Sequence, residues 1–240
     1  MMKEKVLFCW SGGKDSAMAL HQIMKEGTYE VVALLTTFNS NFKRVSMHGV
    51  REELVEKQAE AIGLPLLKVY VSEGTNTEYE NAMETLLLEQ KTKGVTKVIF
   101  GDIFLEDLRA YREKNLLKVN LKAEFPLWKK NTSALIAYFL EQNFKTITCC
   151  VNDAYLGEDK VGMQITKEFI KNLPENVDPC GENGEYHTFC YDGPVFKTPV
   201  KFILGEKVYK PLEIKRSGEE VCPGSTITKG FWYCDLLPNN

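Results

Sequence analysis

A run of small and polar residues, SGGKDS at positions 11–16, directly follows the first apolar segment of the chain. Adjacent glycines let the backbone come close to a ligand, and successive backbone N–H groups at a helix start form a cradle for anions. The serine hydroxyls can donate to phosphate oxygens, and Asp15 can hold Mg²⁺ or stabilise the helix N-terminus. The run therefore predicts a site for the phosphates of a nucleotide. The predicted contacts are Ser11, Gly12, Gly13, Lys14, Asp15 and Ser16.

Alternatives for this run stay open. Its spacing differs from the GxxxxGK[ST] loop of enzymes that cleave the γ-phosphate, so that chemistry is not indicated. Lys14 either lies near the phosphates or points to solvent. A glycine turn that only joins a strand to a helix, capped by Asp15 or Ser16, is the structural alternative.

A second polar run, GENGE at positions 181–185, places two carboxylates around a glycine-containing turn. Such groups can bind Mg²⁺, hold ammonium, or accept its proton as a general base. We predict Glu182 and Glu185 as catalytic, against the alternative of a plain turn. His187 and Thr188 follow this turn and His48 lies in another loop, and each can either contact substrate or be structural. The predicted substrate contacts are His48, Arg112, Gly181, Gly184, His187 and Thr188.

Gly101 and Asp102 end a predicted strand, at the edge where doubly wound sheets bind ligands. Glycine permits close backbone approach there, and Asp102 can bind ribose or metal, or cap the following helix. Arg109 and Arg112 lie three residues apart on one predicted helix face and can grip a carboxylate or phosphate. Salt bridges with neighbouring glutamates on a solvated surface are the alternative for both arginines. We predict catalytic roles for Asp102 and Arg109.

β-branched runs alternate with helical patterns in the first half of the chain, which is typical of βαβ units and a parallel sheet. The predicted strands are 5–10, 31–37, 66–71, 95–100 and 146–151, and the predicted helices 15–26, 50–62, 77–93, 105–118 and 133–142. Ligands bind at the carboxyl ends of such strands, which places Leu35, Thr36 and Thr37 near the adenine. Beyond a boundary near residue 152, short β-rich runs predict a smaller α+β region, joined by a helix at 162–172.

The chain has 240 residues and a formal net charge of −3, from 30 Lys+Arg and 33 Asp+Glu. This balance gives no electrostatic case for binding DNA, RNA or an anionic membrane. No signal-peptide core and no apolar stretch of about twenty residues is present, so a cytoplasmic protein is expected. The seven cysteines include no CxxC pair, which predicts buried thiols rather than disulfides or a zinc site, with Cys180 inert.

Residues 11–16 resemble the SGGxDS signature of the PP-loop, or N-type, ATP pyrophosphatases. Residues 178–189, with the sequence DPCGENGEYHTF, and 192–196, with DGPVF, resemble the second signature of one branch, the diphthine–ammonia ligase family. The segment 101–112 also fits. The resemblance covers most of the chain and is specific to about residue 196.

The resemblance implies a HUP-type α/β fold: a doubly wound, mostly parallel sheet as a PP-loop ATP-binding domain at residues 1–152, and a smaller substrate-binding domain at 153–240. A carboxylate is implied to attack the α-phosphorus of ATP, giving an acyl-adenylate and pyrophosphate, after which ammonia displaces AMP and leaves an amide. The implied cofactors and partners are ATP, Mg²⁺, ammonium and a carboxylate acceptor. In the family reaction the acceptor is diphthine, a modified histidine of elongation factor 2. No glutaminase-like nucleophile motif is visible, so free ammonium or a partner would supply nitrogen.

Other functions stay open. The same chemistry can act on a small-molecule carboxylate such as a corrinoid precursor. A PP-loop tRNA-modifying enzyme would need a catalytic cysteine pair or a basic RNA-binding surface, which the cysteine spacing and net charge do not favour. A nucleotide-binding sensor would bind ATP without cleaving it. Assembly as a homodimer is also considered.

Overall fold

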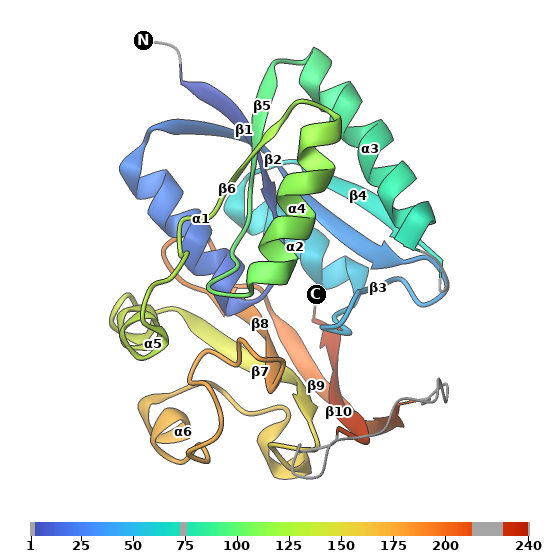
Figure 1. Cartoon of the computed structure of the whole chain (residues 1–240). Helices are drawn as coiled ribbons and strands as arrows, with labels where there is room; N and C mark the ends of the chain where they lie inside the picture. Colours follow the sequence, from blue (N-terminus) through green and yellow to red (C-terminus); the bar gives the residue numbers. More distant parts are fainter. Residues whose placement is uncertain (1–2, 73–75, 213–227, 240) are drawn as a thin grey trace.

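The structure is a computed structural model that describes residues 3–72, 76–212 and 228–239. It contains a parallel sheet with flanking helices and a second, antiparallel sheet (Figure 1). The parallel sheet and its helices comprise β1 (Glu4–Cys9), α1 (Lys14–Glu26), β2 (Tyr29–Asn39), β3 (Arg44–Val45), α2 (Glu52–Ile62), β4 (Leu66–Val71), α3 (Asn76–Thr92), β5 (Val95–Ile99), α4 (Glu106–Lys118) and β6 (Lys122–Glu124). The remainder comprises α5 (Thr132–Glu141), β7 (Lys145–Asn152), a 3₁₀ turn (Glu158–Lys160), α6 (Lys167–Lys171), β8 (Tyr186–Asp192), β9 (Phe202–Pro211) and β10 (Gly230–Pro238).

The order of the parallel strands is what creates the site. β1 lies between β2 and β5, and all three run parallel, while β4 pairs with β2 and β6 with β5. The chain therefore winds outward from β1 through β2 to β4, then returns to β5 on the other side of β1. Such a reversal leaves a crevice at the carboxyl ends of the two central strands, where open α/β sheets bind ligands. The predicted doubly wound α/β fold is confirmed.

Side chains alternate between two faces of this sheet, as the pleat of a strand requires. From β1, Val6 and Phe8 belong to one hydrophobic core with α1 and α2, whereas Leu7 belongs to another with α3 and α4. Helices thus cover both faces, which explains the near-continuous apolar sequence of the central strands. Two of these helices end at glycines in the left-handed conformation, Gly27 and Gly63.

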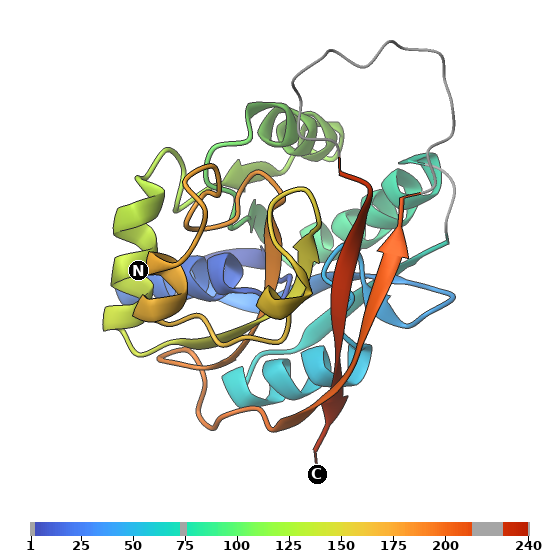
Figure 2. The ribbon, with the colours of Figure 1, turned by 90° about the horizontal axis from the view of Figure 1, so that it is seen from below.

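The second sheet has the order β8-β7-β10-β9 and is antiparallel. Figure 2 shows β9 and β10 side by side along one flank of the molecule. β7 pairs with β8 and β10, so the strand predicted at 146–151 belongs to this sheet and not to the parallel one. The change between sheets lies between β6 and β7, ahead of residue 152, and a domain boundary at 152 stays a prediction. The helix predicted at 162–172 is wrong in extent, because only α6 is helical there.

One core joins the two sheets. The hydrophobic cluster on the α1 and α2 side of the parallel sheet contains Phe8 and Leu20 and extends to Phe189 of β8 and Leu236 of β10. Packing of β8 against the start of α1 brings the predicted acidic turn, which precedes β8, to the carboxyl edge of the parallel sheet. Within the described ranges no helix is long and apolar enough to cross a membrane.

Candidate active site

A cavity of about 1300 Å³ lies between the carboxyl ends of the parallel strands and the segment that leads into β8. Its walls come from the loop after β1, the end of β2, the loop after β5, helices α3 and α4, and residues 181–188. It therefore gathers segments that are far apart in the sequence. The predicted site residues that line it are Ser11, Lys14, Asp15, Ser16, Thr36, His48, Gly101, Asp102, Arg112, Gly181, Glu182, Gly184, His187 and Thr188.

The predicted phosphate loop lies between β1 and α1. Helix α1 begins at Lys14, so the backbone N–H groups of its first turn have no partners within the helix. Gly12 has φ +80°, which disfavours a side chain, and a Cβ there would lie 2.7 Å from Oε1 of Gln58. The Ser11 hydroxyl accepts from the Gly13 N–H at 3.2 Å and donates to Ser16 Oγ at 3.2 Å. The loop is compact and presents both serines to the cavity.

Gln58 stabilises the phosphate loop through hydrogen bonds, and this role was not predicted from the sequence. Its Nε2 donates to the Gly12 carbonyl at 2.9 Å, and its Oε1 accepts from Trp10 Nε1 at 2.9 Å. The Cys190 N–H of β8 donates to the same Gly12 carbonyl at 2.8 Å. The side chain is fully buried, on the α2 face that also buries Leu54 and Ile62. A polar residue four positions from both of these apolar residues is a signal that could have revealed its role.

Gly101 brings the loop after β5 against the phosphate loop. A Cβ at Gly101 would lie 3.1 Å from the backbone carbon of Asp15 and 3.1 Å from the backbone nitrogen of Ser16. A side chain at this position would push the two loops apart by a few tenths of an ångström, so glycine favours their close contact. The close approach predicted at the end of this strand is therefore present, and it serves contact between the two loops.

Lys14 lies inside the protein rather than in solvent, with 2% of its surface exposed. Its Nζ donates to both carboxylate oxygens of Asp15, at 2.9 and 2.8 Å, and to the carbonyl of Cys180. Burial lowers the pKa of Lys14, but the neighbouring Asp15 carboxylate outweighs this and the pKa lies above its usual range. The Lys14 N–H also donates to Thr188 Oγ1 at 3.0 Å, so this residue connects the phosphate loop both to β8 and to the turn before it.

Glu182 faces the cavity from that turn. Its Oε1 accepts from the backbone N–H groups of Ile103 at 2.8 Å and Phe104 at 3.4 Å, in the loop after β5. Burial and the nearby Asp15 carboxylate raise the pKa of Glu182 to about 7. A carboxylate with that pKa exchanges a proton near neutral pH, which suits a general base.

Glu185 does not face the cavity, and the catalytic prediction for it is not supported by its position. It is fully buried, and its carboxylate accepts from the N–H groups of Asp178 and Asn183, at 2.9 Å each, and from Asn183 Nδ2 at 3.1 Å. These bonds close the turn on itself. A catalytic role for Glu185 therefore stays a prediction, and its hydrogen bonds favour a structural role. The sequence pattern does not reveal that two acids three residues apart in a tight turn point to different sides.

Asp102 and Arg112 form an ion pair on the cavity wall. Arg112 Nε lies 2.7 Å from Asp102 Oδ2, and the guanidinium lies over the ring of Phe100 at 4.4 Å. Arg109 lies outside the cavity lining: its Nε pairs with Glu113 at 2.8 Å, and its guanidinium stacks on Trp128. The surface alternative thus describes Arg109, because the two arginines are turned apart on α4.

His48 and His187 come together on the cavity wall, with ring centroids 4.7 Å apart. His48 Nδ1 lies 3.1 Å from the Thr188 carbonyl. Burial lowers the pKa of His48 to about 4, and burial together with His48 lowers that of His187 well below its usual range. The buried Thr36 donates its hydroxyl to the Trp10 carbonyl at 2.6 Å, so it fixes the end of β1 as well as lining the cavity.

Comparison with known proteins identifies the family of the chain. Residues 2–123 match a model described as the diphthamide synthase N-terminal domain, and residues 131–219 match the diphthamide synthase C-terminal domain. The chain belongs to the diphthamide synthase family.

Similar proteins carry one name. A diphthine–ammonia ligase of Mus musculus is 29% identical over 226 residues, covering 82% of each chain, and one of Homo sapiens is 28% identical over 216 residues, covering 79% of each. One of Schizosaccharomyces pombe is 28% identical over 238 residues, which is 91% of this chain and 38% of that protein. The relatives are, by name, carbon–nitrogen ligases. The expected family resemblance is confirmed.

Further cavity residues in this diphthamide synthase chain were not predicted. Tyr79 and Met83 face it from α3, and Leu108 and Tyr111 from α4. The members of each pair are three or four residues apart, as expected of residues on one helix face. That spacing was the available signal, but it does not distinguish a cavity wall from a core.

The described cysteines offer no nucleophile. Five are buried, Cys9 is half-buried, and none of these six is in a disulfide. Burial raises the pKa of Cys9 to about 12 and that of Cys180 above its usual range. Such thiols stay protonated at neutral pH and are poor nucleophiles. Cys222 lies outside the described residues.

The Mg²⁺ prediction can be tested against the donors present. Among residues 3–72, 76–212 and 228–239, no group of three or more His, Cys, Asp or Glu side chains could hold a metal ion. Mg²⁺ at nucleotide sites usually takes one or two carboxylates, with phosphate oxygens and waters as the other ligands. Asp15, which lines the cavity beside the phosphate loop, fits that pattern as a single carboxylate ligand.

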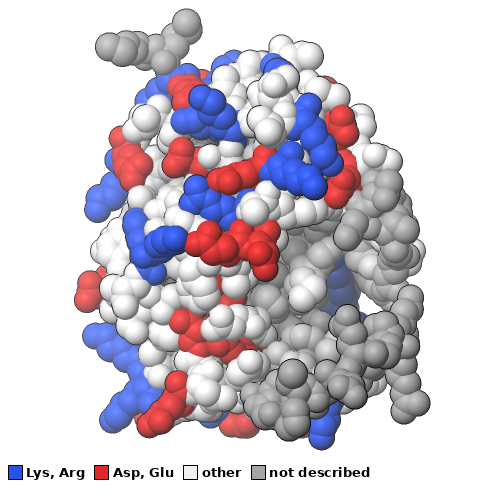
Figure 3. Space-filling model, viewed as in Figure 1, with Lys and Arg blue, Asp and Glu red and all other residues white. Residues whose placement is uncertain are grey.

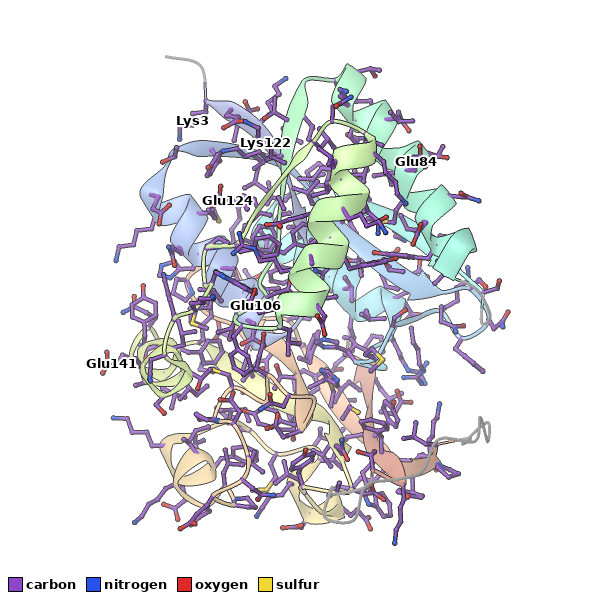
Figure 4. All side chains as sticks on the ribbon, viewed as in Figure 1. Lys3, Glu84, Glu106, Lys122, Glu124 and Glu141 are labelled. Carbon is purple, nitrogen blue, oxygen red and sulfur yellow. The ribbon has the colours of Figure 1, made fainter. Side chains whose placement is uncertain are left out.

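Charges of both signs are mixed on the face of the molecule that Figure 3 shows. On the face in Figure 3, Lys and Arg alternate with Asp and Glu and form no continuous basic stripe. Exposed charges such as Lys3, Glu84 and Glu141 lie at the periphery in Figure 4.

Proposed function

We propose that the chain is an ATP-dependent ligase that adenylates a carboxylate, releases pyrophosphate and transfers ammonia to the activated carbon, as a diphthine–ammonia ligase does. The observation that carries this proposal is the meeting of the phosphate loop, the Asp102–Arg112 pair and Glu182 around one cavity. At about 1300 Å³ the cavity exceeds the roughly 300–1,000 Å³ of pockets for a single small ligand. It has room for a nucleotide and the end of an acceptor.

The triphosphate would lie against the serines of residues 11–16 and the start of α1, with adenosine along the end of β2 near Thr36. The N–H groups of Gly13 and Lys14 already donate to Ser11 and Thr188, so the N–H groups that follow them would face the phosphates. Asp15 would hold Mg²⁺, which when bound would neutralise charge on the phosphates. The departing pyrophosphate gains negative charge, so fixed donors there lower the barrier. The loop is held by Gln58 and Cys190, and fixed donors need little reorganisation during the reaction.

The acceptor carboxylate would approach Arg112. Its guanidinium is already held by Asp102 and Phe100, so it presents its remaining N–H donors in a fixed direction. A carboxylate oxygen then attacks the α-phosphorus and the bond to the pyrophosphate oxygen breaks. The products of this step are an acyl-adenylate and pyrophosphate.

Glu182 would act in the second step. With a pKa of about 7, it can accept a proton from ammonium near neutral pH and leave ammonia as the nucleophile. Ammonia forms a bond to the acyl carbon, and the bond between that carbon and the AMP oxygen breaks. The amide keeps the nitrogen with two hydrogens, and AMP departs with the electron pair. Two protons go to solvent: the one that Glu182 accepted from ammonium and the one that the nitrogen loses after it has bonded to carbon.

The substrate follows from the family relatives. Because they are named diphthine–ammonia ligases, we propose diphthine of elongation factor 2 as the acceptor and ammonium as the nitrogen donor. A small-molecule carboxylate such as a corrinoid precursor is the second candidate, since Arg112 recognises a carboxylate whatever carries it. A tRNA-thiolating function is disfavoured by the raised pKa values of the described thiols. The free thiols suit the reducing cytoplasm.

The test is a product assay. Purified protein is incubated with Mg-ATP and ammonium, and the protein fraction and the small-molecule fraction of its own cells are added separately. AMP that forms only with the protein fraction supports a macromolecular acceptor, and AMP that forms only with the small-molecule fraction supports a metabolite. ADP, or nucleotide bound without cleavage, would reject the ligase in favour of a hydrolase or a sensor.

A further inference from the structure

Two of the three histidines of the chain meet beside the phosphate loop. His48 comes from the segment after β3 and His187 from β8, and their ring centroids are 4.7 Å apart. His48 also packs on the loop itself, since a Cβ on Gly13 would lie 2.9 Å from its Cε1 atom. The pair therefore borders the place where the phosphates of a nucleotide are proposed to lie.

The hydrogen bonds of the pair are incomplete. The Thr188 carbonyl can only accept, so His48 must carry its proton on Nδ1, which leaves Nε2 as an acceptor in the neutral ring. Nε2 of His187 is buried and has no hydrogen-bond partner within the described part of the chain. Buried polar atoms without partners are rare in folded proteins and call for an explanation. Because His187 lines the cavity, a ligand bound there would give this nitrogen a partner.

The charges around the pair are few. Lys14 of α1 is the cation whose field reaches both rings, and it is paired with Asp15. On the other side, Arg44 donates to the carbonyl of Gly49, next to His48, and is paired with Asp235 of β10. Burial and the Lys14 cation keep both rings neutral at neutral pH, and among the described residues no carboxylate contributes to the pKa shift of either ring.

We propose that His48 and His187 belong to the polyphosphate site, and that nucleotide binding is coupled to uptake of one proton by this pair. This inference rests on the proposed ATP site at the phosphate loop. A polyanion beside two buried imidazoles favours their charged form, and an imidazolium donates from both nitrogens, which gives the unpartnered nitrogen a partner. The proton comes from solvent and stays on the pair while the anion is bound.

Proton uptake can be measured without altering the protein. Calorimetric titration of Mg-ATP at pH 6.5, in buffers of different ionisation enthalpy, gives the number of protons taken up per nucleotide bound. NMR of the histidine Cε1–H signals then locates them. With only three histidines, two signals should titrate at higher pH in the presence of Mg-ATP, while that of His21 stays unchanged.

Variants separate the pair from the nucleotide itself. At pH 6.5 the double variant His48→Gln/His187→Gln should take up fewer protons per bound nucleotide than the wild type, by about half a proton or more. Protonation of the phosphates is common to both proteins, so it cancels in this difference. His21→Gln is the control, since His21 lies on α1 against Tyr138 and outside the cavity lining. Equal uptake in wild type and double variant, or unchanged histidine signals, would overturn the proposal. Absence of Mg-ATP binding would reject the proposed function as well, whereas binding without uptake rejects only this coupling.

Discussion

The two walls of the cavity use different chemistry. The wall from the parallel sheet presents backbone: the N–H groups at the start of α1, and Gly101 against Asp15 and Ser16. The wall from the second sheet presents side chains that titrate, Glu182 and His187. Anion binding can be built from backbone alone, but proton transfer requires a titratable group. We propose that the backbone groups of the first wall bind the phosphates of the nucleotide, with His187 of the second wall beside them, and that Glu182 of the second wall activates ammonia.

Glu182 and Glu185 show the same contrast on a smaller scale. Both belong to one turn, yet Glu182 accepts from a different loop and faces the cavity, whereas Glu185 binds only N–H groups of residues 178–183. The pKa of Glu182 is raised to about 7. One carboxylate is thus available for chemistry and the other holds the turn.

Substitution of Glu182 is expected to have the largest effect on the rate of amide formation. Glu182→Gln should lower the rate of amide formation by about 100-fold or more, because the variant has no base to accept the proton of ammonium. The acyl-adenylate step should persist, since Glu182 does not act in it. The measurement is amide formation alongside exchange of labelled pyrophosphate into ATP.

The pH dependence supplies the control for this variant. The pH profile of the wild type should show an inflection near pH 7, where Glu182 loses its proton. Glu182→Gln should lack this inflection, and its rate should rise only as the concentration of free ammonia rises. The pKa of Glu182 in the folded protein is about 7, above its usual 4.5, so the folded state binds more protons than the unfolded state between these two values. The contribution of Glu182 to the free energy of unfolding therefore falls as pH rises from about 4.5 to about 7. Glu182→Gln should lack that part of the decline. Full ligase activity in the variant would contradict the assignment.

Lys14→Met should have the next largest effect, a loss of stability. It removes one partner of a buried ion pair and leaves the Asp15 carboxylate unpaired, at a cost of roughly 3 kcal/mol of unfolding free energy in urea denaturation. Lys14→Arg keeps the charge and should lose less. A Lys14→Met protein as stable as the wild type would show that the link to Cys180 and Asp15 contributes little.

Glu185→Gln should lower the unfolding free energy by about 2 kcal/mol, because its buried carboxylate accepts three hydrogen bonds. Activity should fall only as far as the turn loosens. Glu175→Gln, at an exposed position in the same segment, is the matched control and should change stability by no more than about 0.5 kcal/mol. If Glu185→Gln instead abolished amide formation at unchanged stability, the two acids would share a catalytic role.

The smallest effect is expected at Arg109. Arg109→Gln should change stability by about 1 kcal/mol or less, through lost stacking on Trp128, and leave turnover unchanged. Arg112→Gln on the same helix should impair activity and cost roughly 3 kcal/mol, because it leaves Asp102 unpaired. Steady-state kinetics and denaturation of both variants check this, and equal losses at the two positions would contradict the cavity geometry.

The predictability of the site follows the same division. The phosphate loop was readable because backbone geometry depends on glycines and on the order strand, loop, helix. The directions in which the side chains of Glu185 and Arg109 point could not be predicted. They depend on how the turn and the helix pack against the rest of the protein, which a single sequence does not show. The placement of β7 failed for a related reason: a strand shows its own pattern but not its partner.

The most direct test of the two-wall mechanism is pyrophosphate exchange without ammonium. The protein is incubated with Mg-ATP, labelled pyrophosphate and the diphthine-bearing protein fraction, and the label in ATP is followed over time. Reversible adenylation predicts label in ATP that depends on the acceptor and persists in Glu182→Gln. Absence of label, or ADP as the product, would contradict attack on the α-phosphorus and with it the proposed ligase.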